Sequence, residues 1–92
     1  MKNTTTANHI ANHLNKVAHI EGHEILEDND RTVSAIVRLS NGEAFSYKFR
    51  PEMQDGTANL DHNIGGHFVT EYAASSTHAA IILAAALRDH YA

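Results

Sequence analysis

Histidine is the residue type with the greatest capacity for chemistry in this chain, which has eight histidines among 92 residues. Imidazole binds zinc and exchanges protons near neutral pH. His9 and His13 are four residues apart on a predicted helix, where both rings can reach one metal ion. The residues between them are Ile10, Ala11 and Asn12, so the glutamate of the HExxH protease pattern is missing. Two exposed histidines on a polar helix face are the simpler interpretation.

A second candidate metal site precedes the last predicted helix. Asp61, His62, His67 and Glu71 supply carboxylate and imidazole ligands that suit zinc or another divalent ion, and Asp55 can join them. His62 and His67 are the two residues predicted to bind the metal. A histidine-dependent metal-binding or small-ligand-binding protein is therefore the alternative to the main functional hypothesis given below.

Nucleophilic catalysis has less support from the sequence. Ser75, Ser76 and Thr77 precede a predicted helix and His78 is adjacent, but the G-x-S-x-G pattern is absent. Helix capping explains these hydroxyl groups without further assumptions. The chain has no cysteine, which removes disulfides, thiolate chemistry and thiol–zinc sites together. We therefore predict a protein that is not an enzyme and that uses no cofactor.

Length and charge limit the remaining classes. A chain of 92 residues has room for one domain, residues 1–92, with one modest core. Its formal charge of −4 argues against non-specific binding to nucleic acid, which needs clustered Lys and Arg. Met1–Ala7 is polar, and the longest apolar run, Ala79–Leu87, is too short to span a bilayer. We expect a soluble cytoplasmic protein with no membrane partner.

The segment Arg31–Arg50 gives the clearest structural signal, because Ser40-Asn41-Gly42 separates two β-rich runs. A two-residue loop at Asn41-Gly42 would mix apolar and polar side chains on both faces of the hairpin. A three-residue loop gathers the large apolar side chains on one face and gives Gly42 the left-handed position. This second register is preferred, and it pairs Val37 with Phe45, Ala35 with Tyr47, and Val33 with Phe49.

The remaining elements follow from apolar spacing. A helical stripe, with Gly22 as its C-terminal stop, is formed by Ala7, Ile10, Ala11, Leu14, Val17 and Ala18. His23–Glu27 is predicted as a first strand beside the hairpin. The last helix begins near Ser75–Thr77, ends near Tyr91, and has a core face of Ala80, Leu83, Ala84, Leu87 and Tyr91.

Two segments leave alternatives open. Residues 52–66 have turn composition, and a loop of this length is either functional or conceals a missed element. His67–Tyr72 has strand composition, but it could equally start the last helix. The predicted fold class is α+β: an N-terminal helix, a three-stranded antiparallel meander that a fourth strand can extend, and a C-terminal helix packed on one sheet face.

The remaining candidate sites lie on the predicted surface. The hairpin face opposite the core is expected to be locally basic, and it is either an ordinary solvent-exposed face or a binding face. The predicted partner-binding residues on it are Ile36, Arg38, Lys48 and Arg50. Ile81 and Ile82 widen the apolar arc of the last helix, and this second side can meet the first helix, the long loop or another subunit. They are the predicted interface of a homodimer.

The main functional hypothesis is a small, acidic, non-enzymatic module that binds a protein partner. Small acidic domains without cysteine or catalytic motifs include many inhibitors of host complexes encoded by phages or mobile elements, anti-CRISPR proteins among them. This comparison is an analogy of size and charge, with no shared motif.

Overall fold

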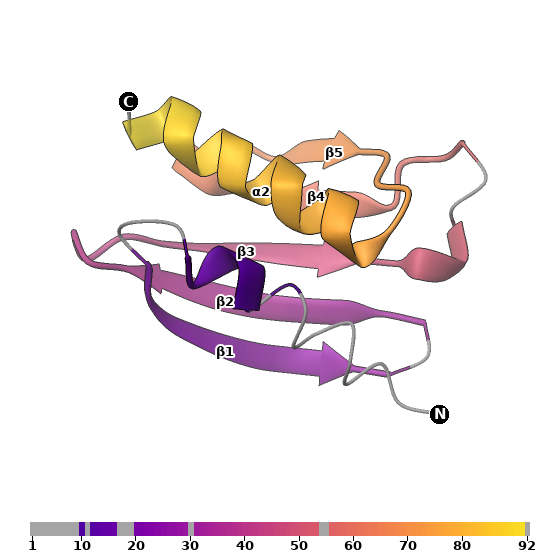
Figure 1. The fold of residues 1–92 in the computed structure, drawn as a ribbon, viewed down its shortest axis with the longest axis horizontal. Coiled ribbons are helices and arrows are strands. Elements are labelled where there is room, and N and C mark those ends of the chain that lie inside the picture. Colours follow the sequence, from indigo (N-terminus) through magenta and orange to yellow (C-terminus); the bar gives the residue numbers. More distant parts are fainter. Residues whose placement is uncertain (1–9, 11, 17–19, 30, 54–55, 92) are drawn as a thin grey trace.

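The computed structural model describes residues 10, 12–16, 20–29, 31–53 and 56–91. These residues are built around a five-stranded antiparallel sheet. The strand order is β1-β2-β3-β4-β5, so every strand pairs with its sequence neighbour and the sheet is a meander (Figure 1). The elements are β1 (Ile20–Asp28), β2 (Val33–Leu39), β3 (Ala44–Phe49), the 3₁₀ turn η1 (Pro51–Met53), β4 (Leu60–His62), the 3₁₀ turn η2 (Ile64–Gly66), β5 (Val69–Glu71) and helix α2 (Ser76–Tyr91).

The β2–β3 hairpin has the predicted register. Val37 pairs with Phe45, Ala35 with Tyr47, and Val33 with Phe49, and all six of these side chains are buried. The loop of residues 40–42 is closed by Leu39, whose N–H donates to the carbonyl oxygen of Glu43 at 2.8 Å. Gly42 has a φ of +89°, the left-handed conformation that this loop requires.

The predicted N-terminal helix is wrong, and with it the predicted fold as a whole. Before β1, the described residues form only a short helical turn at positions 10 and 12–14, followed by a turn in which the Lys16 N–H donates to the His13 carbonyl oxygen. Gly22, the predicted helix stop, lies inside β1. The apolar spacing itself was informative, because Ile10 and Leu14 are fully buried in the core. Ala7, Ala11, Val17 and Ala18 lie outside the described residues.

Strand β1 begins at Ile20, before the predicted stop of the helix, and its pairing satisfies the backbone of β2 along the whole strand. Ile20 pairs with Leu39 and Asp28 with Val33, so β1 covers β2 from end to end. A strand limited to the predicted His23–Glu27 would leave buried backbone groups of β2 without partners.

The C-terminal half of the sheet contains one predicted and one unpredicted strand. The strand predicted within His67–Tyr72 is present as β5, so the alternative, an early start of the last helix, is wrong. Strand β4 was hidden in the segment assigned to a long loop, and its three residues pair with β3 on one side and β5 on the other. Within the described residues the sheet therefore has five strands, where three with an optional fourth were predicted.

Helix α2 covers one face of this sheet, as predicted (Figure 1). Ser75 caps it, because its Oγ accepts a hydrogen bond from the His78 N–H at 3.1 Å. The predicted core positions are buried, and they share one cluster with Ile10 and Leu14: Ala80, Leu83, Ala84 and Leu87. The side chain of Tyr91 lies outside the described part. Within that part, no helix has the length and apolar character needed to cross a membrane.

Candidate functional site

The sheet face that points away from α2, here called the outer face, carries the predicted partner-binding residues. Arg38 and Lys48 are exposed on it, and Ile36 and Arg50 are half-buried. The hairpin register explains this grouping: the buried apolar residues alternate with Ile36 and Arg38 along β2 and with Lys48 along β3, and Arg50 directly follows β3.

The three predicted cations of the outer face each have a carboxylate partner, and the sequence had not indicated any of these pairs. Arg38 pairs with Glu24 on β1 at 3.3 Å, and Arg50 pairs with Asp61 on β4 at 3.0 Å. Lys48 lies 3.7 Å from Glu27. Three cations and three carboxylates give these pairs no net charge. The face was expected to be basic, but positive and negative side chains alternate on it. Only the pairing of β1 and β4 with the hairpin could reveal this.

An open depression of about 400 Å³ lies on the outer face between β1 and the start of β5. Lys48 and Arg50 line it together with two apolar side chains at its borders, Leu26 and Phe68. Leu26 is 53% exposed and Phe68 is 87% exposed. Leu26 is positioned by a shift in the β1–β2 register between Ile25 and Glu27, where β1 has one residue more than β2.

The polar groups of the depression are held by different numbers of contacts. Glu27 is fixed from two sides, because its Oε1 accepts a hydrogen bond from the Ser34 hydroxyl at 3.0 Å and lies near the Lys48 ammonium. The Arg50–Asp61 pair has one hydrogen bond, from Nη2 to Oδ2, while Arg50 Nε and Asp61 Oδ1 make none. The second bond of a two-pronged arginine–carboxylate pair is therefore missing.

The predicted metal ligands His62 and His67 are not brought together. His62 points into the core and is 4% exposed, whereas His67 is exposed in the loop before β5. The Nε2 atom of His62 lies 3.5 Å from Glu71 Oε2, while Asp61 faces the other side of the sheet and pairs with Arg50. Among the described residues, no group of three or more His, Asp or Glu side chains is placed to hold a metal ion. His9 and Asp55 lie outside those residues.

The predicted hydroxyl cluster and dimer interface are placed as follows. Ser75 and His78 cap the start of α2. Ser75 Oγ accepts a hydrogen bond from the His78 N–H, and His78 Nδ1 accepts one from the Ala74 N–H at 2.9 Å. Ile81 is 48% exposed on α2, but Ile82 is half-buried and packs against the core. Of the predicted interface pair, Ile81 is the more accessible.

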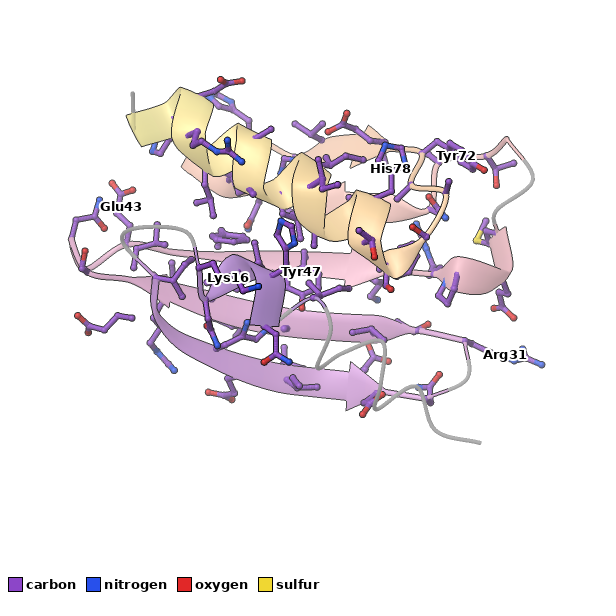
Figure 2. The ribbon with its side chains drawn as sticks, viewed as in Figure 1. Lys16, Arg31, Glu43, Tyr47, Tyr72 and His78 are labelled. Carbon is purple, nitrogen blue, oxygen red and sulfur yellow. The ribbon has the colours of Figure 1, made fainter. Side chains whose placement is uncertain are left out.

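Sequence reasoning missed a polar contact on the core face between His23 and Tyr47. The His23 Nε2 atom lies 3.0 Å from the Tyr47 hydroxyl, and the two rings meet edge-on at 5.8 Å. Tyr47 is near the middle of the sheet on the side of α2 (Figure 2). Burial lowers the pKa of His23 and raises the pKa of Tyr47, so both groups are held neutral. The two residues lie on β1 and β3, which are separated by β2, and no pattern in the sequence indicates that they are close.

No known protein family, curated protein or solved structure matches the chain.

Proposed function

We propose that this protein is a non-enzymatic interaction module that binds a protein partner through its outer face. The observation that carries the proposal is the depression itself, in which Lys48 and Arg50 lie between the exposed side chains of Leu26 and Phe68. Phenylalanine and arginine are both enriched at protein interfaces, and Phe68 and Arg50 line the same depression.

The energetics of the face suit a partner that supplies an apolar side chain flanked by polar groups. Complete burial of a side chain such as Leu or Phe contributes about 1.5–3 kcal/mol. The two ion pairs that line the depression, Lys48–Glu27 and Arg50–Asp61, are at least partly solvated, and exposed pairs of this kind are worth about 0–1 kcal/mol each. A partner can therefore exchange them for its own charges at small cost to the fold.

The biological setting that we propose is inhibition of a host complex, as by small proteins of phages or mobile elements. A domain of this size can inhibit by occupying a surface and needs no catalytic group to do so. This setting is proposed from size and charge alone. The proposal that the outer face binds a protein does not depend on it.

The test is affinity capture from a lysate of the source organism, with quantification of the proteins bound by each variant. Lys48→Glu, Arg38→Glu and Leu26→Ser alter the outer face at exposed positions. Their matched controls are Arg31→Glu, an exposed cation beyond the hairpin, and Ile81→Ser on α2. We expect Lys48→Glu and Leu26→Ser, which alter the lining of the depression, to lose captured partner by about tenfold or more. Arg38→Glu, on the same face but outside the lining, should weaken capture by charge reversal.

Thermal unfolding separates binding from folding in the same set of variants. The melting temperatures should remain within a few degrees of the wild-type value, since surface substitutions away from the core usually change stability by about 0.5 kcal/mol or less. Capture that is insensitive to the outer-face variants, or that the controls reduce equally, would show that this face is not the site.

A further inference from the structure

The two edge strands of the sheet differ in how they are protected from other strands. Strand β1 is nine residues long, has two register shifts and carries Glu21, Glu24 and Glu27, features that discourage pairing with another edge. Strand β5 is short and carries one charge, Glu71, but it has neither a register shift nor a proline. Its three residues are all exposed, and among the described residues its only neighbouring strand is β4.

Apolar side chains gather around this edge. Phe68 is 87% exposed, Val69 37% and Tyr72 41%, so three of the five residues from 68 to 72 present large apolar groups. Strands with exposed edges of this composition associate unless a charge, a proline or a bulge prevents it. Glu71 is the one charged residue in the segment.

We propose that two copies of this chain pair through their β5 edges, antiparallel, about a two-fold axis at Thr70. In this register Phe68 lies opposite Tyr72 of the second copy, and Val69 lies opposite Glu71. Aromatic pairs across antiparallel strands stabilise a sheet, and the two-fold axis gives the dimer two such pairs. No two like charges face each other, whereas the glutamates of two β1 edges would repel.

A second copy is favoured over a foreign strand because the segment is complementary to itself. Phe68 and Tyr72 lie two positions before and two positions after Thr70, so reversal of the strand again places an aromatic residue at each of these positions. An antiparallel pair has its two-fold axis perpendicular to the sheet, and both outer faces then lie on one side of a continuous sheet. The dimer would present two outer-face depressions on a single surface.

Single cysteines test this pairing directly, because the natural chain has none. Residues opposite each other in an antiparallel pair are about 4.5–5.5 Å apart between Cα atoms, which is within the range that a disulfide bridges. Mild oxidation of Thr70→Cys should give a covalent dimer as the main product. Glu24→Cys on β1 and Ile81→Cys on α2 are matched exposed controls and should remain mostly monomeric.

The mass of the unmodified protein in solution gives a second measurement. We expect a concentration-dependent dimer whose dissociation constant rises about tenfold in Thr70→Lys, since two ammonium groups then meet at the axis. Thr77→Lys, the same change at an exposed position of α2, should leave the dimer unchanged. A wild-type monomer at high concentration, or preferential cross-linking through Ile81→Cys or Glu24→Cys, would overturn the proposal.

The two proposals share one residue, Phe68, which borders the depression and pairs across the proposed dimer interface, but they can fail separately. Lys48→Glu should reduce partner capture without changing the dimer, and Thr70→Lys should break the dimer in a protein that still folds.

Discussion

Two asparagines hold the short strand β4 in the sheet. Asn59 is fully buried, and its side chain donates to the Ala73 carbonyl oxygen at 2.9 Å and accepts from the Ala73 N–H at 2.7 Å. At the other end, Asn63 Oδ1 accepts from the Ser46 N–H at 2.7 Å. A strand of three residues makes few ladder bonds of its own, so these side chains supply part of the pairing.

Replacement of Asn59 by alanine should therefore destabilise the protein severely. Asn59→Ala leaves the buried N–H and carbonyl of Ala73 without partners, and each unsatisfied group costs about 1–3 kcal/mol. Chemical denaturation should show a loss of about 2–4 kcal/mol in the free energy of unfolding. Asn41→Ala is the matched control, because its side chain accepts the Glu43 N–H in an exposed turn where water can replace it. Equal effects of the two variants would contradict this role.

Single residues of the candidate site were predicted in part. Lys48 and Arg50 share a face because strand alternation places them there, and alternation can be read from the sequence. Their carboxylate partners Glu27 and Asp61 come from strands whose register the sequence did not define. Phe68 had no signal at all, because exposure of an aromatic residue depends on what the rest of the chain covers.

Among the elements, the hairpin was the most predictable. Its register follows from one local rule. Burial favours the loop length that places all the large apolar residues on one face. The last helix was predictable for a similar reason, since its apolar spacing and its serine cap are local. Neither element needed information from distant parts of the chain.

The loop of the hairpin offers a sharp test of backbone strain. Gly42→Ala places a Cβ in open space, so its whole cost comes from the left-handed φ of +89°, about 1–2 kcal/mol. Gly22→Ala in β1 is the control: its Cβ would lie 3.8 Å from Arg38 Cβ, an ordinary contact, and it should be neutral or slightly stabilising. Each substitution changes the free energy of unfolding relative to the wild-type protein. The two changes should differ in sign or by more than about 1 kcal/mol. A neutral Gly42→Ala would mean that the loop relaxes.

The predicted N-terminal helix failed because an apolar stripe does not determine the length of an element. Ile10 and Leu14 occupy the core as the helical spacing requires, yet the segment from Ile20 pairs with β2. Pairing satisfies the backbone of a buried strand, and this gain is invisible in local propensity. Strand β4 was missed for the same reason, since three residues carry no usable periodicity.

At the scale of the whole molecule, stability should depend on pH in both directions through one contact. Burial lowers the pKa of His23, so below about pH 6.5 the unfolded chain binds a proton that the folded protein resists. The free energy of unfolding then falls as the pH falls. Burial raises the pKa of Tyr47, so above about pH 10 the unfolded chain ionises first and stability falls again.

Two conservative variants separate these branches. His23→Gln retains a hydrogen-bonding group near the Tyr47 hydroxyl and should flatten the acid branch of a plot of unfolding free energy against pH. Tyr47→Phe should flatten the alkaline branch and keep an acid one. If His23→Gln retains the full acid decline, the proton is bound elsewhere and the contact does not control stability in that range.

The sequence by itself determined what depends on neighbours along the chain: a single hairpin register, the left-handed glycine in its loop, the core face of α2, and the alternation that sends Lys48 and Arg50 to the outer face. Tertiary structure decided what depends on pairing across the chain. It set the length of β1, the existence of β4, the neutralisation of the outer face by carboxylates, and the exposure of Phe68. The physical reason is that backbone pairing and burial are satisfied between distant segments, and a side chain's surroundings are fixed only when those segments meet.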